Sequence, residues 1–80
     1  MKDVKVLGSG CANCRTTLQR VEEVAKQHGV EIRLEKVEDM RAMVGYGVMA
    51  TPAVVVDGKV VHAGGVPDRE RIAGWLGVAG

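Results

Sequence analysis

Cys11 and Cys14 are the residues of this 80-residue chain best suited to chemistry, and they are its only cysteines. Two thiols this close can be oxidised to a disulfide and reduced again, or can bind a soft metal ion as thiolates. A secreted disulfide scaffold of this length typically uses ~4–8 cysteines. The pair therefore indicates redox or metal chemistry, with an idle pair of small core residues as the third interpretation.

The cysteines are predicted to lie where a strand passes into a helix. A short strand over 3–7 alternates apolar and polar residues and stops at a turn rich in glycine. The helix that follows has an apolar stripe and ends at Gly29 as its C′ residue. The stripe consists of Cys14, Leu18, Val21 and Ala25.

This placement gives the two cysteines different roles. Cys11 is expected at the mouth of the helix, where the helix dipole and the unsatisfied N–H groups favour a thiolate. Cys14 is expected one turn inside, on the shielded apolar face. Cys11 is therefore the candidate attacking thiol, and Cys14 is the candidate resolving thiol.

The middle of the chain predicts a strand and a short helix. Val30, Ile32 and Leu34 alternate with charged residues, which is typical of a strand with one apolar face. Asp39 is a candidate N-cap for a helix of about two turns. The residues expected to point inward from this helix are Met40, Met43 and Val44.

The last third of the chain predicts a hairpin and a final helix. The β-branched run 53–56 is followed by Asp57-Gly58, a hairpin turn, and a returning strand over 59–62. After Gly64-Gly65, a helix is expected from Pro67 to Leu76, with Ile72, Trp75 and Leu76 as its apolar stripe. The predicted order is β-α-β-α-β-β-α.

Composition favours one ordinary globular domain over residues 1–80. Hydrophobic residues make up 46% of the chain, charged residues 26%, and the net charge is +1. So small a charge offers no field to attract nucleic acid or an anionic membrane. We see neither a signal-peptide core nor a membrane-spanning run, and therefore expect a cytoplasmic protein.

A metal-binding alternative rests on the same two cysteines. The stretch GSGCANC, residues 8–14, resembles the glycine and C-x-x-C loop of the heavy-metal-associated copper chaperones. Cys11 and Cys14 would then bind Cu(I), or Zn(II), as two thiolates. Those chaperones end in a strand, whereas this sequence ends in a predicted helix, so the element order favours redox chemistry. His28 and His62 are expected at the surface, too far away to complete a zinc site.

A second motif, Thr51-Pro52, leads directly into the predicted hairpin. Together with C-x-x-C, the Gly-Gly turn and the last helix, it resembles the thioredoxin/glutaredoxin superfamily, and more closely the small proteins of the redox-active disulfide protein 2 type. The resemblance implies a minimal α/β thioredoxin fold with a four-stranded mixed sheet flanked by three helices. We expect the strand order second, first, third, fourth, with the first and third helices on one face and the second on the other.

The resemblance also implies a site and an activity. Pro52 would follow a cis peptide bond, and the four residues that hold an extended substrate through the backbone would be Thr51, Pro52, Gly64 and Gly65. Candidate modulators of the Cys11 thiolate are Ala12, Asn13 and Arg15. The expected activity is thiol–disulfide exchange with no bound cofactor beyond the redox-active disulfide, and the expected partners are a disulfide-containing target protein and an upstream disulfide reductase.

The sequence departs from the thioredoxin pattern at several positions. Ala12-Asn13 replaces the common Gly-Pro, and Lys5 stands where thioredoxins keep a buried acid. Because of the first departure, the reduction potential cannot be taken from thioredoxin. The second removes the acid that handles the proton of the resolving thiol in thioredoxins. Tyr46 and Met49 are expected either in the core or at an apolar rim beside the cysteines, and Trp75 is expected to anchor the core.

Overall fold

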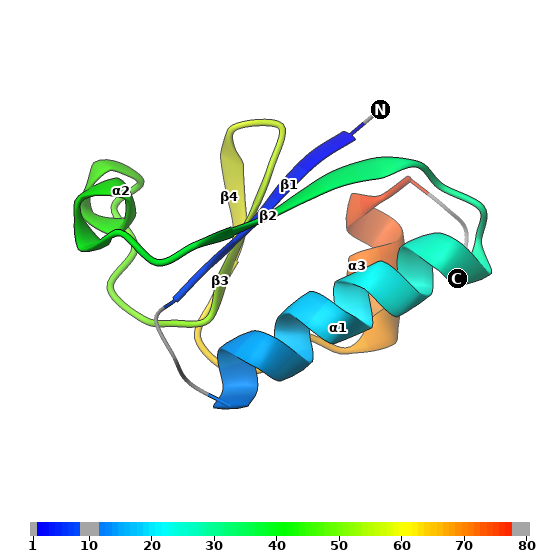
Figure 1. Cartoon of the computed structure of the whole chain (residues 1–80), viewed down its shortest axis with the longest axis horizontal. Helices are drawn as coiled ribbons and strands as arrows, with labels where there is room; N and C mark the ends of the chain where they lie inside the picture. The colour runs from blue at the N-terminus through cyan, green and yellow to red at the C-terminus, as the bar shows by residue number, and fades with distance from the viewer. Residues whose placement is uncertain (1, 9–11, 78–80) are drawn as a thin grey trace.

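The structure is a computed structural model that describes residues 2–8 and 12–77. Its helices and strands follow the predicted order β-α-β-α-β-β-α (Figure 1). Their bounds are β1 (Lys2–Leu7), α1 (Ala12–Gln27), β2 (Ile32–Val37), α2 (Met40–Gly45), β3 (Ala53–Val56), β4 (Lys59–Ala63) and α3 (Arg69–Trp75).

The strands form one mixed sheet in the order β2-β1-β3-β4, which is the predicted order. β1 and β2 run parallel, with Val4 opposite Leu34. β1 and β3 are antiparallel, with Val4 opposite Val56, and β3 and β4 form the hairpin. β1, which leads toward the cysteine motif, therefore lies at the centre of the sheet beside the strand that follows Pro52.

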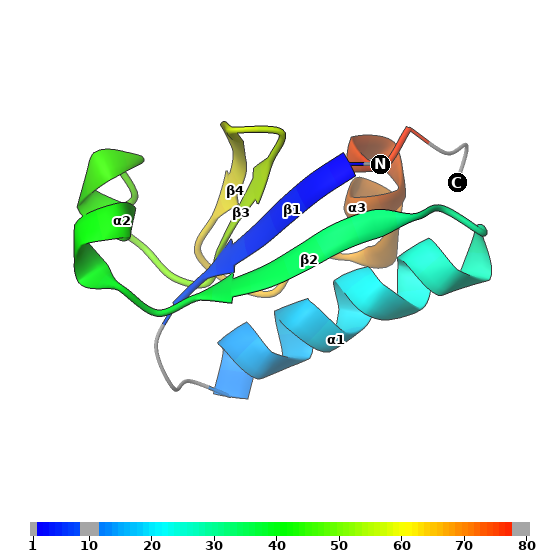
Figure 2. The ribbon, with the colours of Figure 1, turned by 45° about the horizontal axis from the view of Figure 1, so that its top comes forward.

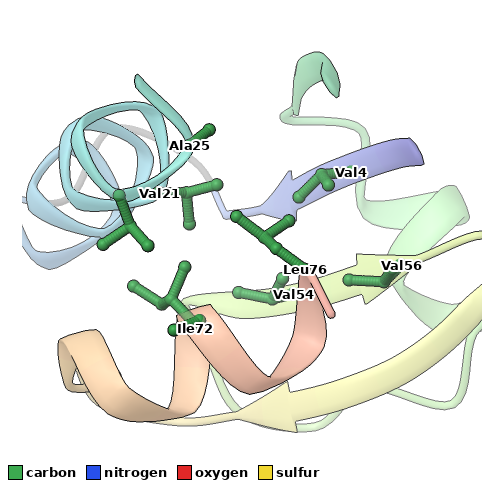
Figure 3. Packing of buried hydrophobic residues seen from close by; sticks show 9 residues of the cluster. Val4, Val21, Ala25, Val54, Val56, Ile72 and Leu76 are labelled. Carbon is green, nitrogen blue, oxygen red and sulfur yellow. The ribbon is translucent and has the colours of Figure 1, made fainter. Parts of the chain in front are cut away.

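Helices α1 and α3 cover one face of this sheet (Figures 1 and 2). Figure 3 shows Ile72 and Leu76 of α3 lying between α1 and the strands. Burial of this apolar surface is the main stabilising contribution. The cluster consists of Val4, Val21, Val24, Ala25, Val54, Val56, Ile72, Ala73 and Leu76.

Helix α2 packs on the opposite face, as predicted, but through fewer residues than the pattern suggested. Met43 and Tyr46, three residues apart, contact the cluster of Leu7, Ala53 and Val55. Met40 and Val44 were predicted to point inward, but they are 73% and 75% exposed. The six-residue helix turns only this one short row toward the sheet, so the expectation for Met40 and Val44 was wrong.

The alternation of Val30, Ile32 and Leu34 predicted a strand that starts at Val30. The observed strand β2 runs from Ile32 to Val37, so it both begins and ends later than predicted. Its limits are set by its partner, because Lys2 of β1 pairs with Ile32 and Leu7 pairs with Val37. The hairpin agrees with the prediction. Asp57 and Gly58 have positive φ values of 50° and 82°, as the favoured two-residue hairpin turn requires.

The end of α1 and the start of α2 also follow the sequence signals, whereas the start of α3 differs from the prediction. Gly29 has φ +65° just after α1, in agreement with its predicted role as C′ residue. Asp39 caps α2, since its Oδ1 accepts a hydrogen bond from Arg41 N at 2.9 Å. Helix α3 begins at Arg69, with Asp68 as N-cap rather than Pro67 in its first turn. Pro67 is buried just before that cap.

Candidate functional site

The first turn of α1 places Cys14 on the buried side of the helix. Its side chain is 2% exposed, and its sulfur is disulfide-bonded. The shielded position predicted for Cys14 is therefore the observed one. Cys11, the candidate attacking thiol, lies outside the described residues. α1 has no acidic residue in its first turn, so no carboxylate there offsets the positive end of the helix dipole.

Gly8 brings the end of β1 against Cys14. A Cβ placed on Gly8 would collide with Cys14 Sγ, and it would lie 3.3 Å from Cys14 Cβ and 3.5 Å from Thr51 Cβ. Gly8 also has φ +154°, which residues with side chains rarely adopt, and its N–H donates to Val37 O at 3.0 Å. Only glycine therefore lets this strand end, Cys14 and the loop before β3 approach each other so closely.

The Thr51–Pro52 peptide bond is cis, and Pro52 is buried. Thr51 is exposed, and no hydrogen bond between described residues uses its backbone N–H or C=O. Cys14 and Thr51 both lie next to Gly8. The structure therefore brings the cysteine motif and the Thr51-Pro52 motif together. An exposed backbone with free donors and acceptors beside a cysteine can pair with an extended segment of another chain.

The Gly64-Gly65 turn lies against the same loop. Gly64 N donates to Pro52 O at 2.9 Å, so the Pro52 carbonyl is already used within the chain. A Cβ on Gly64 would lie 3.3 Å from Ala50 Cβ, whereas one on Gly65 would meet nothing within 4 Å. Gly64 is thus held beside Pro52, and Gly65 is next to it at the surface.

The candidate thiolate modulators are all exposed on the first turn of α1. Arg15 forms no ion pair with any residue in the described part of the chain. The Asn13 carbonyl accepts a hydrogen bond from Thr17 Oγ1 at 2.7 Å. Thr17 is fully buried one turn after Cys14. Sequence reasoning missed it because its hydroxyl interrupts the apolar stripe, while Leu18, which was assigned to that stripe, is only half-buried.

Tyr46 and Met49 were each expected either in the core or at an apolar rim, and the structure places them differently. Tyr46 packs against the sheet with Met43. Met49 is 99% exposed and lines an apolar groove of about 270 Å³ that reaches Thr51. The other residues lining this groove are Met40, Met43, Val44 and Val48.

His62 was predicted to be a surface residue, but it is half-buried. Its ring lies 5.7 Å from that of Trp75, centroid to centroid, and its Nε2 is 3.0 Å from Gly65 O. The reason is that β4 runs past the end of α3, so the side chain has an aromatic neighbour. Trp75 packs against the main core while remaining partly accessible. His28 is exposed, as predicted.

Lys5 occupies the position at which the resemblance would place a buried acid. It is half-buried and lies opposite Val55 on the neighbouring strand. Side chains alternate along β1, so Lys5 points to the face opposite that of Val4 and Val6. It therefore points away from α1, the helix that carries Cys14.

No three histidine, cysteine, aspartate or glutamate side chains in 2–8 and 12–77 come together as ligands for a metal ion. No helix in that part of the chain is long and apolar enough to cross a membrane.

The central β1, the mixed sheet, the flanking helices and the meeting of Cys14 with the Thr51–Pro52 loop define a minimal thioredoxin fold. The family model of the thioredoxin domain matches residues 2–77, and the chain belongs to this family as a small thioredoxin-like protein.

Similar proteins include a thioredoxin of Methanothermobacter thermautotrophicus, 32% identical over 72 residues that make up 90% of this chain and 94% of the relative. A thioredoxin of Methanocaldococcus jannaschii is 29% identical over 69 residues, which are 86% and 79% of the two chains. A probable thioredoxin, also of Methanothermobacter thermautotrophicus, is 35% identical over 65 residues, 78% and 75% of the two chains. These relatives support a thioredoxin-like redox protein.

Proposed function

We propose that this protein is a thiol–disulfide oxidoreductase that reduces disulfides in other proteins through Cys11 and Cys14. The observation that carries the proposal is the close approach of Cys14, Gly8 and Thr51, which places a buried cysteine beside the exposed Thr51, whose backbone forms no hydrogen bond with another described residue. Membership of the thioredoxin family supports oxidoreductase activity in general.

The proposed reaction transfers two electrons from the dithiol to the target. The Cys11 thiolate attacks one sulfur of the target disulfide, and the other target sulfur leaves as a thiolate that takes up a proton. Cys14 then loses its proton and attacks Cys11 Sγ, which breaks the mixed disulfide. The target leaves with both sulfurs reduced, and the Cys11–Cys14 disulfide remains. An upstream disulfide reductase would then supply two electrons to reduce the Cys11–Cys14 disulfide again. We expect this reductase and the target protein to be cytoplasmic.

The proposed roles of the two cysteines follow from their positions. Cys11 immediately precedes the first residue of α1 in the sequence, where the helix dipole favours a thiolate. Cys14 is shielded behind Gly8 and cannot meet a target disulfide first. Thr51 would pair with the backbone of the target, beside Pro52 and the Gly64-Gly65 turn, and the groove at Met49 would receive an apolar side chain.

The first test is a redox titration of metal-free protein in dithiothreitol and glutathione buffers, scored by thiol alkylation and mass. We expect one two-electron transition between about −300 and −180 mV. A pair that forms no intramolecular disulfide across that window would overturn the proposal. Binding of Cu(I) or Zn(II) by the reduced pair would then support the metal-binding alternative.

The roles of the two cysteines are tested with insulin as a disulfide-bonded substrate. We expect Cys14→Ser to trap a mixed disulfide with insulin, because the resolving thiol is missing. Cys11→Ser is the matched control and should form no trapped complex. A Cys14→Ser protein that turns over at the normal rate, or a complex trapped by Cys11→Ser, would contradict the assignment.

A further inference from the structure

The outer edge of β2 is the feature of the fold that the proposed reaction does not use. β2 lies at one end of the sheet, and within residues 2–8 and 12–77 only β1 pairs with it. Alternate residues of such an edge strand leave their N–H and C=O groups available to another strand. α1 runs alongside β2 (Figure 2), and a groove of about 570 Å³ lies between them. Its apolar lining comes from Leu18, Ala25, Val30, Ile32 and Leu34.

We propose that this edge binds a second copy of the same chain. The two β2 strands would run antiparallel about a twofold axis at Leu34, and the four strands of each copy would form one continuous sheet. Leu34 of one copy would lie opposite Leu34 of the other, and the half-buried Leu18 and Leu34 side chains would be covered.

The charges along β2 favour a second copy, and they favour an axis at Leu34 over one at either neighbouring residue. Arg33 and Glu35 are exposed and form no ion pair with any described residue. With the axis at Leu34, Arg33 of each copy lies opposite Glu35 of the other, which gives two attractive cross-strand pairs. An axis at Arg33 or at Glu35 would place like charges opposite each other. The sequence of the strand is therefore complementary to itself.

Lys36 and Ile32 also fit this arrangement. With the axis at Leu34, Lys36 of one copy lies opposite Ile32 of the other, on the groove side of the sheet. Lys36 Nζ is already held by Glu38 Oε1 at 3.0 Å, beyond the end of the strand. The alkyl stem of Lys36 can therefore cover Ile32 without burying the ammonium group.

The opposite edge of the sheet is less suited to pairing. The β3–β4 ladder has a register irregularity between Val54 and Val55, whereas the β1–β2 ladder is regular from Lys2↔Ile32 to Leu7↔Val37. Bulges twist an edge strand and impede its pairing with another chain. β2 is thus the edge that offers an undistorted strand.

Sedimentation equilibrium of the full chain, with its cysteines reduced, tests the proposal from micromolar to millimolar concentration. We expect a reversible monomer–dimer equilibrium. Arg33→Glu should weaken the dimer roughly tenfold, because both attractive pairs become repulsive. The double variant Arg33→Glu/Glu35→Arg should restore the wild-type dissociation constant, because it exchanges the two charges. Lys59→Glu on β4 is the matched control and should leave dimerisation unchanged.

Several results would overturn this inference. The wild-type chain could stay monomeric at millimolar concentration, or Arg33→Glu could dimerise as well as the wild type. The double variant could fail to regain the wild-type dissociation constant, or Lys59→Glu could weaken the dimer as much as Arg33→Glu does. Thermal unfolding of each variant verifies that it folds. Because the inference does not depend on the proposed reaction, insulin reduction can fail or succeed independently of the dimer.

Discussion

Gly8 shows how one residue can determine the geometry of the candidate site. Its missing side chain lets the end of β1 pass directly over Cys14. Gly58, in the hairpin turn, also has a positive φ, but a Cβ there would meet nothing within 4 Å. A side chain at Gly58 would therefore meet only the penalty of a positive φ, whereas one at Gly8 would also collide with Cys14.

We expect Gly8→Ala to lower the free energy of unfolding by about 2–4 kcal/mol, because the new methyl group must displace Cys14. Gly58→Ala should cost only about 1 kcal/mol, since it bears the backbone penalty alone. Chemical denaturation of both variants in the same redox buffer measures the difference. Equal losses in the two variants would show that Gly8 does not pack against Cys14 as described.

Met49 allows a prediction about the target, because its side chain is 99% exposed and contributes little to the core. If the apolar groove beside Thr51 receives part of a target protein, Met49→Ser should raise KM for insulin roughly threefold to tenfold. The rate with a small disulfide such as oxidised glutathione should stay unchanged. Thermal unfolding should also stay unchanged. An unaltered KM for insulin would remove Met49 from the target-binding surface.

At the scale of the elements, the two shorter helices differ in how much they bury. α3 buries Ile72 and Ala73, and its cap Asp68 accepts a hydrogen bond from Arg71 N at 2.8 Å. α2 has a similar cap, Asp39, but buries no residue completely. Asp68 therefore caps a helix that belongs to the core, whereas Asp39 caps a peripheral helix.

We expect Asp68→Ala to reduce the free energy of global unfolding by about 1 kcal/mol, the usual contribution of an N-cap. Asp39→Ala should instead speed hydrogen exchange of the α2 amides, while global unfolding changes by less than about 0.5 kcal/mol. Denaturation and amide exchange on both variants check this. A global loss in Asp39→Ala as large as that in Asp68→Ala would mean that α2 is part of the cooperative core.

The same contrast explains what the sequence could predict. The hairpin, the strand order, the Asp39 cap and the Gly29 helix end depend on local patterns or on a family resemblance, and they agree with the structure. The inward side of α2 could not be predicted, because apolar residues at helical spacing do not show which of them the sheet will meet. The role of Gly8 could not be predicted either, because it depends on contacts with Cys14 and Thr51, which lie 6 and 43 positions further along the chain.

At the scale of the whole molecule, the two apolar clusters share their strands. Val54 and Val56 of β3 face α1 and α3, whereas Ala53 and Val55 of the same strand face α2. Loss of packing on one face must therefore disturb the strand that supports the other. This arrangement predicts one cooperative unit of folding rather than two layers that melt separately.

Ile72→Ala tests this cooperativity, because Ile72 is fully buried between α1 and β3 (Figure 3). We expect a loss of about 3 kcal/mol in the free energy of unfolding. Trp75 fluorescence and far-ultraviolet circular dichroism should still report the same midpoint, because the tryptophan packs on the core that the strands share. Val55→Ala on the opposite face is the matched variant and should also keep the two midpoints together. If the midpoints separate in either variant, the two faces of the sheet unfold independently.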